Sequence, residues 1–189
     1  MKLVKFIKEN KIICLTLVVV FLTFVLLALP GQFAHYDVGP IVNGRATYRF
    51  NLNGYQWFFG TVTKKLGDDE INIGSAVPSG IAAFVLLILS FIGLLFSKKS
   101  SFVSLLVSLA LVVVAVLFFT SSAAGLKAYP NYPLSEEGDY TNMSWVPYVV
   151  ASLSLISGGL MMYRTVLVLK EEVKKPSQGK GTSYSYLHK

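Results

Sequence analysis

The chain has 189 residues, of which 53% are hydrophobic and only 14% are charged. Soluble domains carry about 25% charged residues, so this composition argues against a soluble globular protein. The net charge of +7 is common in nucleic-acid binders. Here, however, the basic residues are grouped at particular points along the chain, which argues against a nucleic-acid partner.

Four long apolar runs dominate the sequence, at about residues 12–30, 77–96, 102–124 and 146–169. A helix needs about 20 mostly apolar residues to cross roughly 30 Å of hydrocarbon, and each run meets this requirement. None contains an acid, and only the fourth contains a base, Arg164. The sequence therefore predicts an all-α membrane protein, a bundle of four transmembrane helices that forms a single integral membrane domain over residues 1–189.

The first run follows a basic head, as the apolar part of a cleavable signal peptide would. It extends for 18 residues before Pro30, and no clean small-x-small cleavage site follows it. We therefore expect an uncleaved membrane span. The lone cysteine, Cys14, lies in this run and excludes an internal disulfide. We expect it to be a packing residue, with palmitoylation as the alternative.

The basic residues also indicate how the chain is oriented, because Lys and Arg collect on the cytoplasmic side of membrane proteins. Twelve of the 17 lie in the head, in the turn between the second and third runs, and at or after the end of the fourth run. The other five share two larger loops, 31–76 and 125–145, with seven acids. We therefore expect a multi-pass protein of the cell membrane, with both termini in the cytoplasm and these two loops outside.

The first outer loop contains two Asn-Gly pairs, Asn43-Gly44 and Asn53-Gly54. Asn-Gly is the strongest short hairpin signal, because a type I′ turn needs positive φ at both central residues. The two turns predict a small antiparallel β-meander of three strands over about residues 38–62. The first turn would pair Val42 with Arg45 and Ile41 with Ala46.

The second turn would place a ladder of aromatic side chains on one face of the meander. Its cross-strand pairs would be Leu52 with Tyr55, Phe50 with Trp57, and Tyr48 with Phe59. Such a face needs a cover, which a partner protein, the bilayer surface or the second outer loop would supply. We expect a partner to bind Phe50, Tyr55, Trp57 and Phe59. The alternative is an interfacial aromatic belt made of Tyr55, Trp57, Phe58 and Phe59.

Small residues recur along the third run at a spacing of seven, which keeps them on one face of a left-handed bundle. Small side chains let membrane helices approach one another closely. The predicted helix-packing residues are Ser101, Ser104, Ser108, Ala115 and Ser122 in the third run, and Ser154 and Gly158 in the fourth. Contact within one bundle is the main interpretation, and a homo-oligomer interface is the alternative.

Arg164 is the one ionisable residue well inside an apolar run. A charge at the bilayer centre costs roughly 2.5–3.5 kcal/mol, but a long Arg near the inner end can extend to the lipid headgroups. We expect this contact with lipid headgroups. The alternative is a buried Arg that pairs with carbonyls or holds a lipid phosphate. Residues 170–189, rich in Lys, Ser and Gly, are predicted to be a disordered cytoplasmic tail.

Groups that carry chemistry are scarce in the sequence. The only histidines are His35 in an outer loop and His188 in the tail, so the sequence predicts no metal cluster and no Ser-His-Asp set. No run holds Asp, Glu, Lys or His at mid-depth, where proton relays and ion-coupled carriers usually place them. We therefore predict a non-enzymatic protein without a cofactor.

With its predicted four spans, cytoplasmic termini, larger first outer loop with strands and smaller second loop, the chain resembles the claudin-like tetraspan proteins in layout. The claudin first loop carries a W-GLW-C-C signature. The nearest segment here is GYQWFFG, residues 54–60, and the two cysteines are absent, so no residue role is carried over. The NGYQWFFG segment and the Lys-rich ends also resemble those of small bacterial four-span membrane proteins.

These features predict a scaffold, adhesion or accessory subunit that acts through its extracellular aromatic β-loop. Its partners would be the lipid bilayer and another membrane or envelope protein, or a second copy of the chain. The alternative is a small transporter or channel component, in one form a homo-oligomer, in which Arg164 and the serine stripe would line a path.

Overall fold

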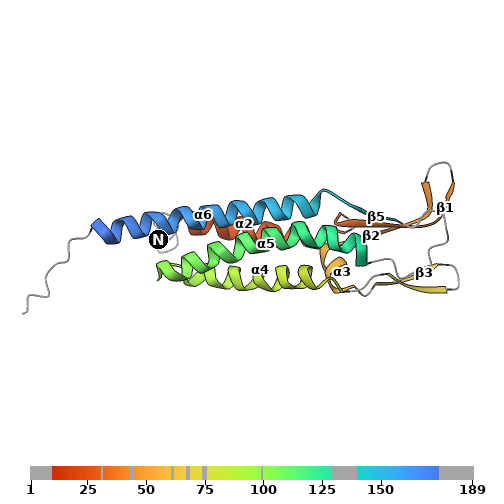
Figure 1. Cartoon of the computed structure of the whole chain (residues 1–189), viewed down its shortest axis with the longest axis horizontal. Coiled ribbons are helices and arrows are strands. Elements are labelled where there is room, and N and C mark those ends of the chain that lie inside the picture. The colour runs from red at the N-terminus through yellow and green to blue at the C-terminus, as the bar shows by residue number, and fades with distance from the viewer. Residues whose placement is uncertain are drawn as a thin grey trace, which may run out of the picture.

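The computed structural model describes residues 10–30, 32–42, 45–60, 62–66, 69–73, 76–98, 100–128 and 140–174. Most of them lie in four long helices (Figure 1), α2 (Lys11–Ala28), α4 (Pro78–Phe96), α5 (Ser101–Ala128) and α6 (Val146–Lys174). Each contains a segment long and apolar enough to cross a membrane. The prediction of four long apolar helices is confirmed, and α5 and α6 continue beyond the ends predicted for them.

The four helices run alternately up and down, and the short connection from Phe96 to Ser101 makes α4 and α5 antiparallel neighbours. The start of α2 and the end of α6 therefore lie at the same end of the bundle as the turn that joins α4 to α5 (Figure 1). We call this end, marked by residues 97–100, the turn end, and the opposite end, which carries the strands, the sheet end. Within the bundle, α5 packs against α4 and α6, and α6 also packs against α2.

A seven-residue repeat explains how each helix buries one face. In α2, the buried residues are separated alternately by three and four positions: Ile13, Thr16, Val20, Thr23 and Leu27. Helix α4 has the same spacing, at Gly80, Ala83, Leu87, Ser90 and Leu94. This spacing is typical of left-handed helix packing. The outward faces remain apolar, as at Val18, which is 65% exposed.

Helices α5 and α6 approach closely at Gly158. The Ser108 hydroxyl of α5 donates a hydrogen bond of 2.8 Å to the Gly158 carbonyl oxygen of α6. A Cβ added at Gly158 would lie 2.9 Å from Val112 Cγ2 and 3.1 Å from the Ser108 carbonyl oxygen. The contact between the two helices therefore requires a residue without a side chain at this position.

At the sheet end, β1 (Ala34–Val42) and β2 (Arg45–Leu52) form an antiparallel hairpin. The predicted pairing of Val42 with Arg45 and of Ile41 with Ala46 is confirmed, while the turn residues 43–44 lie outside the described part of the chain. The register shifts between Val38 and Ile41, where two residues of β1 oppose one of β2. These two residues are Gly39 and Pro40, and Pro cannot donate to the ladder, so a bulge forms there.

The prediction of a third strand in the meander is wrong. After β2 the chain does not turn back at Asn53-Gly54 but forms a short helix, α3 (Gly54–Phe59), so the predicted aromatic ladder is absent. The third strand of this sheet is β5 (Tyr140–Met143), from the second loop, and the strand order is β2-β1-β5. A separate hairpin follows α3, formed by β3 (Val62–Leu66) and β4 (Asp69–Ile73). Figure 1 shows both hairpins projecting from the sheet end.

The C-terminal tail begins later than predicted. Helix α6 continues through Lys174, so it includes residues 170–174, the first five of the segment predicted to be disordered. The remaining residues, 175–189, lie outside the part of the chain that the structure describes. The prediction of disorder is therefore wrong for residues 170–174 and stays a prediction for the rest.

Adjacent glycines in α6 provide a matched test of this helix packing. Gly158→Ala should destabilise the protein by about 1–3 kcal/mol, because the new methyl group meets the α5 backbone. A Cβ at Gly159 has no atom within 4 Å, so Gly159→Ala should leave stability unchanged or raise it by up to about 1 kcal/mol. Thermal unfolding in detergent, followed by circular dichroism, measures both. Equal effects of the two substitutions would contradict this account of α5–α6 packing.

Candidate functional site

The segment NGYQWFFG folds as a helix because its ends are capped by its own residues. The Asn53 side chain accepts a hydrogen bond of 2.9 Å from the Gln56 backbone N–H, and the Gln56 side chain accepts one of 3.1 Å from the Asn53 N–H. This reciprocal pair is a capping box. At the other end, Gly60 has a φ of 70°, a left-handed conformation that ends helices and favours glycine. Both ends of α3 are thus specified locally.

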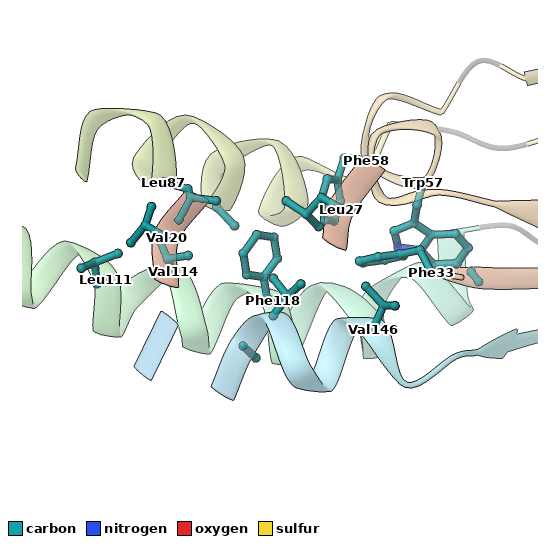
Figure 2. Packing of buried hydrophobic residues seen from close by; sticks show 14 of the residues in the cluster. Val20, Leu27, Phe33, Trp57, Phe58, Leu87, Leu111, Val114, Phe118 and Val146 are labelled. Atoms are coloured by element: carbon teal, nitrogen blue, oxygen red, sulfur yellow. The ribbon is translucent and has the colours of Figure 1, made fainter. Parts of the chain in front are cut away.

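Helix α3 inserts two aromatic side chains into the sheet end of the bundle. Trp57 and Phe58 are fully buried and meet Phe33, which precedes β1, and Phe118 of α5 (Figure 2). The Phe33 ring centroid lies 5.1 Å from that of Phe58 in an edge-to-face arrangement, and 6.4 Å from that of Trp57. Phe58 stacks on Phe118 at 5.5 Å. We call these four residues the aromatic cap, since they fill the sheet end of the bundle.

Backbone hydrogen bonds connect the aromatic cap to the strands and to α4. The Phe33 N–H donates to the Leu52 carbonyl at the end of β2, over 3.1 Å, and the Phe33 carbonyl accepts from the Ser144 N–H after β5, over 3.0 Å. The Val77 N–H, just before α4, donates to the Phe58 carbonyl over 2.9 Å. The sheet is therefore fixed to the bundle through the cap.

Two glycines make room for the aromatic cap. A Cβ at Gly80, in the first turn of α4, would overlap the Phe58 ring. A Cβ at Gly54 would lie 2.7 Å from Leu27 Cδ2 and 3.2 Å from Phe33 Cδ2. Both α3 and α4 thus pack directly, through their backbones, against side chains of neighbouring segments.

The other two aromatic residues of α3 lie on the side of the bundle formed by α2 and α4. Tyr55 and Phe59 each make an edge-to-face contact with Phe84 of α4, at 5.3 and 5.9 Å between ring centroids. The Tyr55 hydroxyl donates to the Phe24 carbonyl of α2 over 3.3 Å. Burial raises the pKa of the Tyr55 phenol, which keeps this donor protonated at neutral pH.

The four predicted partner-binding residues do not share one face. Trp57 is 0% exposed, whereas Phe59 is 46% exposed, and Tyr55, two residues before Trp57, is partly buried. The Phe50 side chain lies outside the described part of the structure, although its backbone pairs with Tyr36 in the sheet. As folded, this segment leaves Phe59 exposed and buries Trp57.

Five of the predicted helix-packing residues are buried, namely Ser104, Ser108, Ala115, Ser154 and Gly158. Ser101 is partly buried at the turn end, and the Ser122 side chain lies outside the described part of the structure. The serine hydroxyls bond mainly to the backbone; Ser154, for example, donates to the Val150 carbonyl over 2.9 Å. This satisfies a hydroxyl without a polar partner on another helix.

Arg164 lies at a pocket rather than on the outer face of α6. Its Nη1 donates a hydrogen bond of 3.1 Å to Ser104 Oγ of α5. Beside it, a cavity of about 410 Å³ opens at the turn end, lined by Ser97, Lys98, Ser100, Ser101, Phe102, Arg164 and Val168. We call this cavity the turn-end pocket. It combines residues from the α4–α5 turn with residues from α6.

Several residues that build these two regions carry a weak sequence signal or none. Asn53 and Gln56 fit the capping-box pattern, and Gly60 follows at a helix C-terminal position, so this segment carries a helix signal beside the hairpin signal of Asn53-Gly54. Phe33 and Phe118 carry no local signal, because their roles depend on contacts between distant segments. The same is true of Lys98 at the turn-end pocket.

The titratable residues of the sheet end that the structure describes lie along its strands, for example His35 and Asp37 on β1 and Arg45 and Arg49 on β2. No group of three His, Cys, Asp or Glu side chains is placed to hold a metal ion in this part of the chain. His35 Nδ1 lies 2.7 Å from Asn51 Oδ1 across β1 and β2, a hydrogen bond that helps to fix the base of the sheet. The arrangement is suited to holding the strands in place.

No protein-family model and no curated protein matches the chain.

The aromatic cap predicts that substitutions at two nearby residues of α3 destabilise the protein to different extents. Trp57→Ala should destabilise the protein by about 3–5 kcal/mol, because it leaves a cavity among Phe33, Phe58 and the helices. Phe59→Ala is the matched control, since its ring is 46% exposed, and should cost less than half as much. Denaturant titration in detergent micelles measures both. Equal costs would mean that Trp57 is not buried as described.

Proposed function

We propose that the chain is a multi-pass protein of the cell membrane, with its turn end in the cytoplasm and its sheet end outside. Each long helix exposes large apolar side chains to the surroundings, for example Phe21 of α2, Ile92 of α4, Val116 of α5 and Ile156 of α6. Helices with such apolar faces are suited to contact with the hydrocarbon chains of lipids. The turn end carries Lys98, Arg164 and Lys170, which favours the cytoplasmic side for it.

We further propose that the protein acts through protein contacts at its sheet end, as a scaffold, adhesion or accessory subunit without enzymatic activity. The observation that carries this proposal is the open edge of β2. In the strand order β2-β1-β5, β2 is an edge strand of eight residues, and no other described strand pairs with its outer side. An edge of this kind presents backbone N–H and C=O groups to which another strand can be added.

The connection between the sheet and the bundle supports this role. Because Phe33 bonds to Leu52 and Ser144, β2 and β5 are held against the aromatic cap. An edge that is already ordered loses little conformational entropy when a partner strand binds, which favours binding. The proposed occupant is an extended segment of another membrane or envelope protein.

The packing of the bundle supports contact rather than conduction through a single chain. Between its two ends the described interior is formed mainly by apolar side chains, including Val20, Leu87 and Leu111 (Figure 2), and the buried polar side chains among them are mostly serines and threonines. At the sheet end, the aromatic cap closes the space between the helices. The alternative of a small transporter or channel component would therefore need a path between protomers of a homo-oligomer.

One cross-strand row of the sheet allows a sharp test of the edge. Phe50 of β2, Tyr36 of β1 and Thr141 of β5 occupy directly opposed positions. A photoreactive benzoylphenylalanine placed at each position in turn, in cells that produce the full chain, should give covalent adducts with one defined protein. The adduct yield should be several times higher at Phe50 than at Tyr36, because Tyr36 is flanked by strands on both sides.

The control uses the same probe at Phe102, an exposed residue at the turn end, which should not capture that protein. Adducts between differently tagged copies of the chain would identify a second copy as the occupant. Equal yields at all three sheet positions would contradict edge binding and favour contact through the face of the sheet. The absence of any defined adduct at Phe50 would contradict the contact function itself.

A further inference from the structure

The turn-end pocket gathers positive charge from two parts of the chain. Lys98 comes from the α4–α5 turn and Arg164 from the second half of α6, and both line the same cavity of about 410 Å³. Three serines, Ser97, Ser100 and Ser101, also line the wall, and the hydroxyl of Ser97 donates a hydrogen bond of 2.7 Å to the Leu94 carbonyl. The lining, as far as the structure describes it, contains no carboxylate. A cavity of this volume lies within the range of about 300–1,000 Å³ typical of small-molecule sites.

Arg164 is held in position by buried hydroxyls behind it. Its Nη1 bonds to Ser104 Oγ, which also lies 2.9 Å from Thr165 Oγ1. Ser104 and Thr165 are both buried, so this contact fixes one corner of the guanidinium. A guanidinium has five N–H donors in a rigid fork, and this bond uses one of them. The side chain is thus oriented before any ligand arrives.

The start of α5 adds to the positive potential of the pocket. Ser100 precedes this 28-residue helix, and its hydroxyl accepts a hydrogen bond of 3.4 Å from the Val103 N–H. The N-terminus of a long helix carries a partial positive charge, equivalent to roughly half an elementary charge. Because Ser100, Ser101 and Phe102 line the pocket, this end of the helix faces it together with Lys98.

We propose that the turn-end pocket binds a phosphate group, with Arg164 and Lys98 as its charged ligands. An oriented Arg fork, a Lys, serine hydroxyls and a helix N-terminus together are the groups that recognise phosphate oxygens in proteins. Ser104 is a positioning residue in this site, because it acts on the phosphate through Arg164. The inference goes beyond the contact function proposed for the sheet end and does not depend on it.

The walls of the pocket indicate that the phosphate belongs to a lipid headgroup. Phe102, at the start of α5, is 67% exposed, and Val168 lines the cavity from α6. Polar walls therefore adjoin apolar side chains on the outer surface of two long apolar helices, which is where a lipid changes from headgroup to chain. The lipid source rests on the membrane location proposed above, whereas the phosphate chemistry does not.

Soluble short-chain probes test the site on the full chain in a non-ionic detergent. Titration calorimetry with dioctanoyl phosphatidic acid should detect saturable binding, and dioctanoylglycerol, which lacks the phosphate, should not bind at this site. Competition by glycerol 3-phosphate then shows whether the phosphate belongs to a lipid or to a soluble phosphate ester. Weak or no competition by it identifies a lipid phosphate, and competition at similar concentration identifies a soluble phosphate ester. Either result is consistent with a phosphate site.

Matched charge substitutions locate the binding. Arg164→Gln and Lys98→Gln should each weaken binding of dioctanoyl phosphatidic acid about tenfold. Lys170→Gln, which removes the same charge from an exposed position on α6 outside the pocket lining, should change it less than about twofold. Ser104→Ala should weaken binding less than Arg164→Gln, with helix content unchanged. Lys98 is exposed in the turn, so its substitution leaves the bundle folded and keeps the test decisive.

Two outcomes would overturn the proposal. If Lys170→Gln weakens binding as much as Lys98→Gln, the probe responds to surface charge and not to this pocket. If Lys98→Gln and Arg164→Gln bind the probe as the unaltered chain does, or if no saturable binding occurs at all, the pocket does not take phosphate. Neither result would bear on the cross-linking at β2, so failure here stays distinct from failure of the contact function.

Discussion

The burial of two aromatic side chains from a six-residue helix is the constraint on which the rest of the sheet end depends. Trp57 and Phe58 can enter the bundle only because α3 is closed at both ends, by the Asn53–Gln56 capping box and by Gly60 in a left-handed conformation. Once they are buried, the Phe58 carbonyl accepts a hydrogen bond from the start of α4, and the Phe33 backbone forms hydrogen bonds with the ends of β2 and β5. Such a short helix has little stability of its own, so the apolar burial and the local caps stabilise it together.

Much of the helical part of this fold could be predicted from the sequence, because it is specified by a strong and repeated signal. Runs of about 20 mostly apolar residues leave few alternatives, and the seven-residue spacing of Ser108 and Ala115 correctly indicates which face of α5 is buried. The two Asn-Gly pairs are more instructive. Asn43-Gly44 lies between two strands that pair as the turn predicts, whereas Asn53-Gly54 opens a helix. The dipeptide is the same, and the difference comes from Gln56 and Gly60, which cap a helix, and from the space that Gly80 leaves for Phe58.

The candidate sites were harder to predict, for a physical reason. Arg164 stands out in the sequence because it interrupts an apolar run, but nothing near it in the sequence indicates Lys98 or Ser104, which belong to the α4–α5 turn and to α5. Their proximity follows from the register of α6 against α5, which is set by close contacts such as that of Gly158 with Ser108. The same holds for β5, which joins β1 from a loop about 100 residues away. Contacts of this kind are properties of the packed structure and leave no local pattern.

The two ends of the bundle differ in packing and polarity. At the sheet end, hydrogen bonds of Phe33 with Leu52 and Ser144 fix β2 and β5 to the aromatic cap, and the Val77 N–H joins the start of α4 to it. At the turn end, the cavity beside Arg164 stays open and polar, with buried hydroxyls only behind the guanidinium. Between them, the described interior is formed largely by apolar side chains, with buried serines and threonines among them. The two ligands that we propose, an extended protein segment at the sheet end and a phosphate group at the turn end, would each bind from their own side of the bundle.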